Sequence, residues 1–151
     1  MLESLQKDED TKIAKGLKSR EVLEPLHQIT RRYEALKLEG DNLVVLDSVS
    51  SFSLPELSTG AQEQILLALR IGFARKILKH DQLFLILDDA FQYSDWKRRA
   101  WLMDVMVDLA RTGWQIIYFT MDDHIKALFE SRGKVFGDKY RAYQLSGEIL
   151  A

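Results

Sequence analysis

The chain has 151 residues, no cysteine and a formal net charge of -2 at pH 7. Its length suits one domain or a large piece of one, and a hydrophobic fraction of 46% is enough for a sizeable core. The lack of cysteine excludes disulfides and thiolate metal sites, and the small net charge excludes a global basic field that attracts nucleic acid. No apolar run approaches the length of a membrane span, and no signal-peptide pattern follows Met1, so we expect a cytoplasmic protein without a membrane partner.

The first part of the chain is polar, with leucine and isoleucine recurring at loose helical spacing. This pattern predicts a helical segment over residues 1–34 that Pro25 kinks or restarts. Two interpretations stay open, because the apolar stripe is thin: the root of a coiled-coil arm, or a frayed terminal helix. We expect residues 35–151 to form the main lobe.

Two short runs of strand-forming pattern follow, at residues 35–38 and 43–46, with Gly40 in the turn between them. Such runs joined by a turn that contains glycine predict a β-hairpin. Residues 48–53 predict a polar loop or a short third strand, which Pro55 closes.

A helix that is apolar on most sides is predicted directly after the sequence LSTGAQ, residues 57–62. Thr59 and Gln62 fit a capping box, which is a purely structural role. Ser58, Gly60 and the free N–H groups of a helix start also fit an anion site, because Gly60 lets a phosphate approach the backbone closely. Both interpretations hold together, since a capped helix start is where a phosphate would dock.

The sequence LFLIL, residues 83–87, is a continuous apolar run that predicts a strand buried on both faces. It leads into Asp88 and Asp89, at the strand end where open α/β sheets bind their ligands. This is the shape of a Walker B element, in which the first acid holds Mg²⁺ and the second positions the attacking water. A helix cap after a core strand is the structural alternative.

Ser94 or Asp95 is predicted to cap a helix that runs from Trp96 to about Arg111, with an inward stripe that begins at Trp96. The basic run at residues 97–99 is most simply a solvated face, although it also suits contact with phosphate.

A second buried strand is predicted over residues 114–120. Strand, helix and strand at this length predict a βαβ unit with parallel strands, so His124 falls at the same sheet edge as the two aspartates. A short helix from Ile125 and a last strand over residues 141–145 complete the expected elements.

In this order, the helix start, the acidic strand end and the later histidine resemble the C-terminal half of an ABC-type ATPase head, as in the SMC, RecF and RecN families. Residues 57–62 resemble the ABC signature motif, residues 83–89 resemble Walker B, and Asp95 resembles the D-loop aspartate. The signature stretch is most similar to the YhaN-like branch of bacterial SMC-type ATPases. The resemblance covers roughly residues 20–145.

The resemblance implies an α/β fold: the C-terminal half of a P-loop ATPase head, with a mainly parallel sheet flanked by helices and an N-terminal helix and β-hairpin. In such families two heads enclose two ATP molecules with Mg²⁺, and the larger task is DNA repair or chromosome maintenance. The implied partners are an N-terminal lobe that carries Walker A, a second head in an ATP-dependent homodimer, and DNA.

The resemblance also assigns roles to single residues. It gives the Mg²⁺ shell to Asp88, orientation of the attacking water to Asp89, and a switch role to His124. The residues that it assigns to nucleotide contact are Ser58, Thr59, Gly60, Gln62 and Asp95.

Three departures qualify this expectation. No Walker A sequence occurs in these residues, so we expect the chain alone not to hydrolyse ATP. Asp89 stands where the family usually has glutamate, and its shorter side chain predicts slow turnover in the complete protein. The histidine comes three residues later than usual, so either His124 serves after a shift of one turn or the switch is absent.

Two further hypotheses belong to other classes. A lobe with this fold could act without turnover, as a dimerisation or interaction module. The acids and caps could also be purely structural in an unrelated α/β core, in which case the acids would not converge with His124 at one sheet edge.

Overall fold

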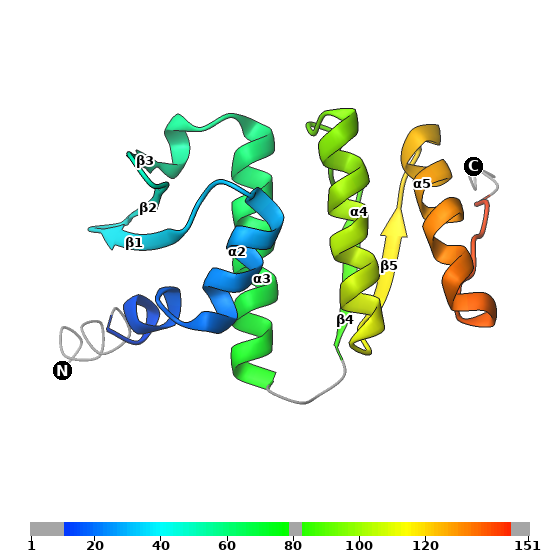
Figure 1. Ribbon diagram of the computed structural model, residues 1–151, viewed down its shortest axis with the longest axis horizontal. Helices are drawn as coiled ribbons and strands as arrows, with labels where there is room; N and C mark the ends of the chain where they lie inside the picture. The colour runs from blue at the N-terminus through cyan, green and yellow to red at the C-terminus, as the bar shows by residue number, and fades with distance from the viewer. Residues whose placement is uncertain (1–10, 79–82, 146–151) are drawn as a thin grey trace, which may run out of the picture. The chain divides into compact units, whose positions relative to one another are not determined.

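The computed structural model describes residues 11–78 and 83–145 (Figure 1). By internal contacts the chain divides into two compact units. The first contains the described residues up to Leu83 together with Ala90–Ser94, and the second contains Phe84–Asp89 and the described residues from Asp95 onward. No described helix is both long enough and apolar enough to cross a membrane.

Two packed helices form the centre of the first unit. Helix α2, Arg20–Thr30, lies against α3, Thr59–Leu78 (Figure 1). The two backbones approach closely at Gly72, where an added Cβ would lie 2.6 Å from the Cα of Val22. The crossing therefore depends on a residue without a side chain, and it brings Val22 and Ile71 into the core.

The N-terminal helical segment differs from the prediction in where it breaks. The described residues 11–17 are helical, and α2 restarts after Ser19, whose hydroxyl donates to the carbonyl of Gly16 at 2.7 Å. Pro25 lies inside α2 and does not restart the helix, so of the two predicted effects of Pro25 the restart is wrong. The first ten residues of the predicted segment lie outside the described part.

A small antiparallel sheet completes the first unit. Strands β1, Ala35–Glu39, and β2, Asn42–Leu46, form the predicted hairpin, and Gly40 takes the positive φ of 60° that the tight turn requires. Strand β3, Ser51–Ser53, pairs with β2 and leads into the 3-10 helix η1, Leu54–Glu56.

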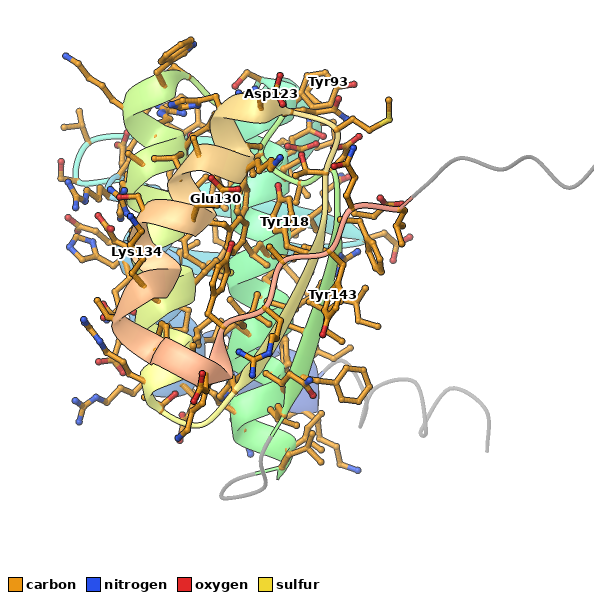
Figure 2. All side chains as sticks on the ribbon, turned by 90° about the vertical axis from the view of Figure 1, so that its right-hand side faces the viewer. Tyr93, Tyr118, Asp123, Glu130, Lys134 and Tyr143 are labelled. Atoms are coloured by element: carbon orange, nitrogen blue, oxygen red, sulfur yellow. The ribbon has the colours of Figure 1, made fainter. Side chains whose placement is uncertain are left out.

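The second unit is a βαβ unit followed by a helix. Strand β4, Phe84–Asp88, pairs in parallel with β5, Gln115–Phe119, and α4, Trp96–Arg111, connects them as the sequence predicts. Helix α5, Asp123–Gly133, packs on β5 through Phe129 and Tyr118, whose ring centroids lie 4.8 Å apart. Figure 2 labels Tyr118 on β5 and Glu130 on α5. The 3-10 helix η2, Lys134–Lys139, is the last described helix of this unit.

The sheet content agrees with the prediction only in part. The fold is mixed α/β, but the first unit holds a three-stranded antiparallel sheet and only the two-stranded sheet of the second unit is parallel, so a mainly parallel sheet is not confirmed. The predicted last strand at residues 141–145 is wrong, because the described backbone there is irregular. A strand forms only where a neighbour pairs with its N–H and C=O groups, and those residues have no described strand partner.

Burial of β4 also differs from the prediction. Phe84 is 66% exposed and Ile86 is 54% exposed, whereas Leu87, on the opposite face, is buried. The described residues therefore cover one face of this parallel sheet, although such sheets are normally covered on both. The apolar run of β4 therefore includes side chains on a face that the described residues do not cover.

The core face of α4 is likewise displaced from the predicted stripe. Its buried residues are Leu102, Met103, Met106 and Leu109. Trp96 is 71% exposed instead of facing inward.

Candidate functional site: a helix start and an acidic sheet edge

The start of α3 is built around Ser58. The carbonyl of Ser58 accepts the backbone N–H of Gln62 at 3.0 Å, and its hydroxyl accepts the N–H of Ala61 at 3.4 Å. Ser58 is thus the residue that caps the helix, and the predicted capping box of Thr59 and Gln62 is wrong by one residue. The Gln62 side chain instead donates to the carbonyl of Leu57 at 2.8 Å.

The exposure of this helix start suits contact with a partner. Ser58 and Thr59 are exposed, and the first N–H groups of a helix have no acceptor inside it. Gly60 is buried, and its missing side chain already has a structural reason. An added Cβ at this position would lie 2.6 Å from the carbonyl oxygen of Tyr93.

The acidic end of β4 lies beside the end of β5. Asp88 is exposed, and among the described residues it has no ion-pair partner. The backbone N–H of Asp89 donates to the carbonyl of Phe119 at 2.9 Å, and its carboxylate accepts the N–H of Met121 at 3.3 Å. Asp89 therefore ties the carboxyl ends of the two parallel strands together.

Asp95 is the residue that caps α4. Its carboxylate accepts the N–H of Arg98 at 2.9 Å and lies 3.5 Å from the guanidinium of the same residue. Of the two predicted caps, the structure therefore selects Asp95 rather than Ser94. Ser94 is buried and belongs to the first unit.

His124 lies in the first turn of α5, next to the start of α4. Its ring stacks on Trp96, with centroids 4.2 Å apart and planes at 29°. Its Nδ1 atom is buried without a hydrogen-bond partner in the described chain. The position directly after Thr120 belongs to Met121, which is 93% exposed.

An ion pair fixes the start of α5 to α4. The carboxylate of Asp122 caps α5 by accepting the N–H groups of His124 at 2.9 Å and Ile125 at 3.1 Å, and it pairs with Arg99 at 2.7 Å. The hydrogen bond from Ile125, followed by the Arg99 pair, holds the pKa of Asp122 below its usual value. Sequence reasoning missed this role, because Arg99 lies in a basic run that has the pattern of a solvated face.

Within the second unit the structure thus gathers the predicted residues at one sheet edge. Asp88 is the last residue of β4 and Asp89 follows it, Asp95 caps α4, and His124 lies in the first turn of α5. No described hydrogen bond or ion pair joins His124 to Asp89. Ser58, Thr59, Gly60 and Gln62 belong to the first unit. Within the described ranges, no group of three or more acidic or histidine side chains forms a ready-made metal cage.

Comparisons with known proteins point to one kind of fold. No family model matches the chain. The YhaN protein of Bacillus subtilis is 38% identical over 76 residues, which is 50% of this chain and 8% of YhaN. An SMC ATPase structure, from work on ATP-driven dimerization and DNA-stimulated activation, has a TM-score of 0.61 over 81% of this chain and 77% of its own, at 14% identity. This chain has the fold of the C-terminal lobe of an SMC-like ATPase head.

Other SMC heads agree with this fold. The Pyrococcus furiosus Smc head bound to the C-terminal domain of ScpA matches 73% of this SMC-like lobe and 29% of that chain, with a TM-score of 0.56 and 16% identity. The Thermotoga maritima SMC head matches 80% of the lobe and 44% of that chain, with a TM-score of 0.51 and 18% identity. The resemblance read from the motifs is confirmed at the level of the fold, and the roles of single residues stay predictions.

Proposed function

We propose that this chain is the C-terminal half of an SMC-type ATPase that hydrolyses ATP between two dimerised heads. The observation that supports this most is the pair Asp88 and Asp89 at the carboxyl end of a parallel strand, in a lobe with the SMC-head fold. The chain has no Walker A sequence, so the complete site needs an N-terminal lobe that carries one.

The residues at the sheet edge fit a magnesium nucleotide. Mg²⁺ keeps several waters and usually takes one or two carboxylates besides the phosphate oxygens, so it does not need a cage made only of protein side chains. Asp88 offers such a carboxylate, exposed and without a described ion-pair partner. When bound, Mg²⁺ would neutralise charge on the phosphates, and Asp88 would hold its water shell.

Asp89 is proposed to orient the attacking water. Its carboxylate has two oxygens, and Oδ1 accepts the N–H of Met121. The other oxygen remains to accept a hydrogen bond from water, while the backbone of β5 fixes the direction of the group. In this proposal His124 has the switch role. It lies at the start of α5, where its ring stacks on Trp96.

The start of α3 is proposed to act in trans on the γ-phosphate held by the opposite head. The hydroxyl of Ser58 and the N–H groups of the first turn are donors at an exposed helix start, where the helix dipole favours an anion. Thr59, Gly60 and Gln62 support this surface, and Asp95 is proposed to couple the two sites across the dimer.

The open face of β4 supports an N-terminal lobe as partner. Phe84 and Ile86 are apolar and exposed on a parallel strand, a position that is covered in most α/β proteins. We propose that the Walker A lobe lies on this face, and that residues 1–34 form the root of the coiled-coil arm. Dimerisation and stimulation by DNA are described for the SMC ATPases of this fold, so a task in DNA repair or chromosome maintenance is part of the proposal.

The test is Mg·ATP turnover, measured by phosphate release. The chain is assayed alone and then mixed with the Walker A lobe from the same gene. We expect activity only in the mixture, and we expect Asp88→Asn and Ser58→Arg each to abolish it. Arg70→Ala, at an exposed position on α3 away from both motifs, is the control that keeps activity.

A second candidate function is an interaction module without turnover. The exposed apolar face of β4 is the observation that favours it, because large exposed apolar patches mark protein contacts. If the two lobes associate but release no phosphate under any condition, the interaction module replaces the ATPase proposal.

A further inference from the structure

The loop Ala90–Ser94 separates Asp89 from Asp95 in the sequence, yet it packs with the first unit. Phe91 is buried and takes a left-handed φ of 73°, and its carbonyl accepts the N–H of Ser94 at 3.0 Å. The carbonyl of Tyr93 occupies the space beside Gly60 where a side chain would stand. The loop therefore rests on the first turn of α3 with no room to shift inward.

One side-chain hydrogen bond joins the same loop to the next turn of α3. Nε2 of Gln64 donates to Oγ of Ser94 at 3.3 Å, and Gln64 is only 3% exposed. Burying an amide without a hydrogen-bond partner costs free energy, so the Gln64–Ser94 hydrogen bond favours the conformation in which the loop packs on α3. Gln64 stands just before an apolar run that begins with Ile65, where a leucine would pack without this cost.

Gly60 and Gln64 lie four residues apart, so they share one face of α3. That face holds the loop, whereas Ser58 and Thr59 at the same helix start are exposed. A displacement of the helix start would therefore move the loop, and the loop continues directly into Asp95, the cap of α4.

We propose that Gln64 and Ser94 are positioning residues that fasten the loop to α3, so that binding at the start of α3 is passed to Asp95. The part of this inference that concerns binding rests on the proposed function. The attachment of the loop to α3, called the link below, rests on the contacts of Gln64, Gly60 and Ser94 alone.

The link is tested by amide hydrogen exchange of the Ser94 N–H in the full chain. Gln64→Leu and Ser94→Ala should each speed this exchange about tenfold, which corresponds to the loss of one buried hydrogen bond. The effects of the two single variants should not add in the double variant, because both remove the same contact.

Thr30→Val is the matched control for this measurement. It removes a buried hydroxyl from the same unit, one that donates to the carbonyl of Leu26 at 2.7 Å, but it does not touch the loop. It should leave Ser94 exchange as in the wild type. Exchange unchanged in Gln64→Leu, or additive effects of Gln64→Leu and Ser94→Ala, would overturn the link.

Turnover of the chain mixed with its Walker A lobe tests transmission. Gln64→Leu should lower kcat about tenfold with an unchanged KM for ATP, and Ser94→Thr, which keeps the hydroxyl, should retain activity. A raised KM with unchanged kcat would overturn transmission. If the wild type releases no phosphate, the proposed function fails, and the exchange result alone then supports or overturns the link.

Discussion

Asp89 has a backbone conformation that few residues adopt. Its φ is 44°, in the left-handed region where aspartate and asparagine are tolerated better than longer side chains. A glutamate at this position, which the resemblance of the sequence to Walker B would predict, would therefore carry a backbone cost in addition to its different reach. An aspartate at this position therefore suits the backbone conformation at the end of β4 as well as the proposed role of its carboxylate.

This conformation gives a stability prediction. Asp89→Asn should leave the free energy of unfolding within about 0.5 kcal/mol, because asparagine tolerates the same φ and keeps an acceptor for Met121. Asp89→Glu should lower it by about 1 kcal/mol or more. Urea unfolding of the three chains measures both, and a glutamate variant as stable as the asparagine variant contradicts the argument.

Asp122 gives a pH prediction. Its pKa is lowered in the folded state, first by the Ile125 N–H and then by Arg99, so its stabilising effect is complete above its unfolded pKa and is lost as the pH falls through the folded value. Asp122→Asn keeps a helix cap but removes the charge.

The comparison is made by urea unfolding of wild type and Asp122→Asn between about pH 6 and pH 3. The advantage of the wild type should shrink below about pH 4 and be constant above about pH 5. An advantage that stays the same over the whole range would show that the charge of Asp122 does not stabilise the fold.

At the scale of elements, the crossing of α2 and α3 is the most constrained contact. Gly72→Ala raises helix propensity by about 1 kcal/mol, but its Cβ would meet the backbone of Val22 at 2.6 Å and force the helices apart. We expect a net loss of about 1–3 kcal/mol in the free energy of unfolding. Arg70→Ala, exposed on the same helix, should change it by less than about 0.5 kcal/mol. A more stable Gly72→Ala chain would show that α2 and α3 can move apart at Gly72 without a loss of stability.

Short stretches of sequence were sufficient to predict the elements that depend on turn residues and apolar runs. The hairpin around Gly40 and the βαβ unit from β4 to β5 follow from turn residues and apolar runs, and both are confirmed. The break at Ser19 instead of Pro25, and the cap at Ser58 instead of Thr59, differ because hydrogen bonds of single residues decide them.

The parts that sequence could not predict depend on distant partners. The missing strand at residues 141–145 and the open face of β4 concern neighbours that no local pattern reveals. At the candidate site, the order of Ser58, Asp88, Asp89 and Asp95 was visible in the sequence, whereas the links of Gln64 to Ser94 and of Arg99 to Asp122 join residues far apart in the chain.

At the scale of the whole molecule, the apolar face of β4 predicts self-association of the chain alone. Phe84→Ser combined with Ile86→Thr should reduce concentration-dependent association, because it removes two exposed apolar side chains from one face. Sedimentation velocity over a range of concentrations measures this.

The same double variant should also lose its association with the Walker A lobe. Val49→Ser is the control, since Val49 is a highly exposed apolar residue of the first unit. Equal association of the wild type, the double variant and the control would show that this face is not a contact surface.

The stacking of Trp96 on His124 has a practical consequence, because indole fluorescence depends on contact with water. Trp96 is exposed at the acidic sheet edge, whereas Trp101 and Trp114 are partly buried. Covering Trp96 by a second head would shift its emission to shorter wavelengths. The chain thus carries a native fluorescent reporter at the edge where the proposed ATP-dependent contact forms. A Trp96→Phe chain gives the emission of the other two tryptophans, from which the signal of Trp96 is obtained by difference.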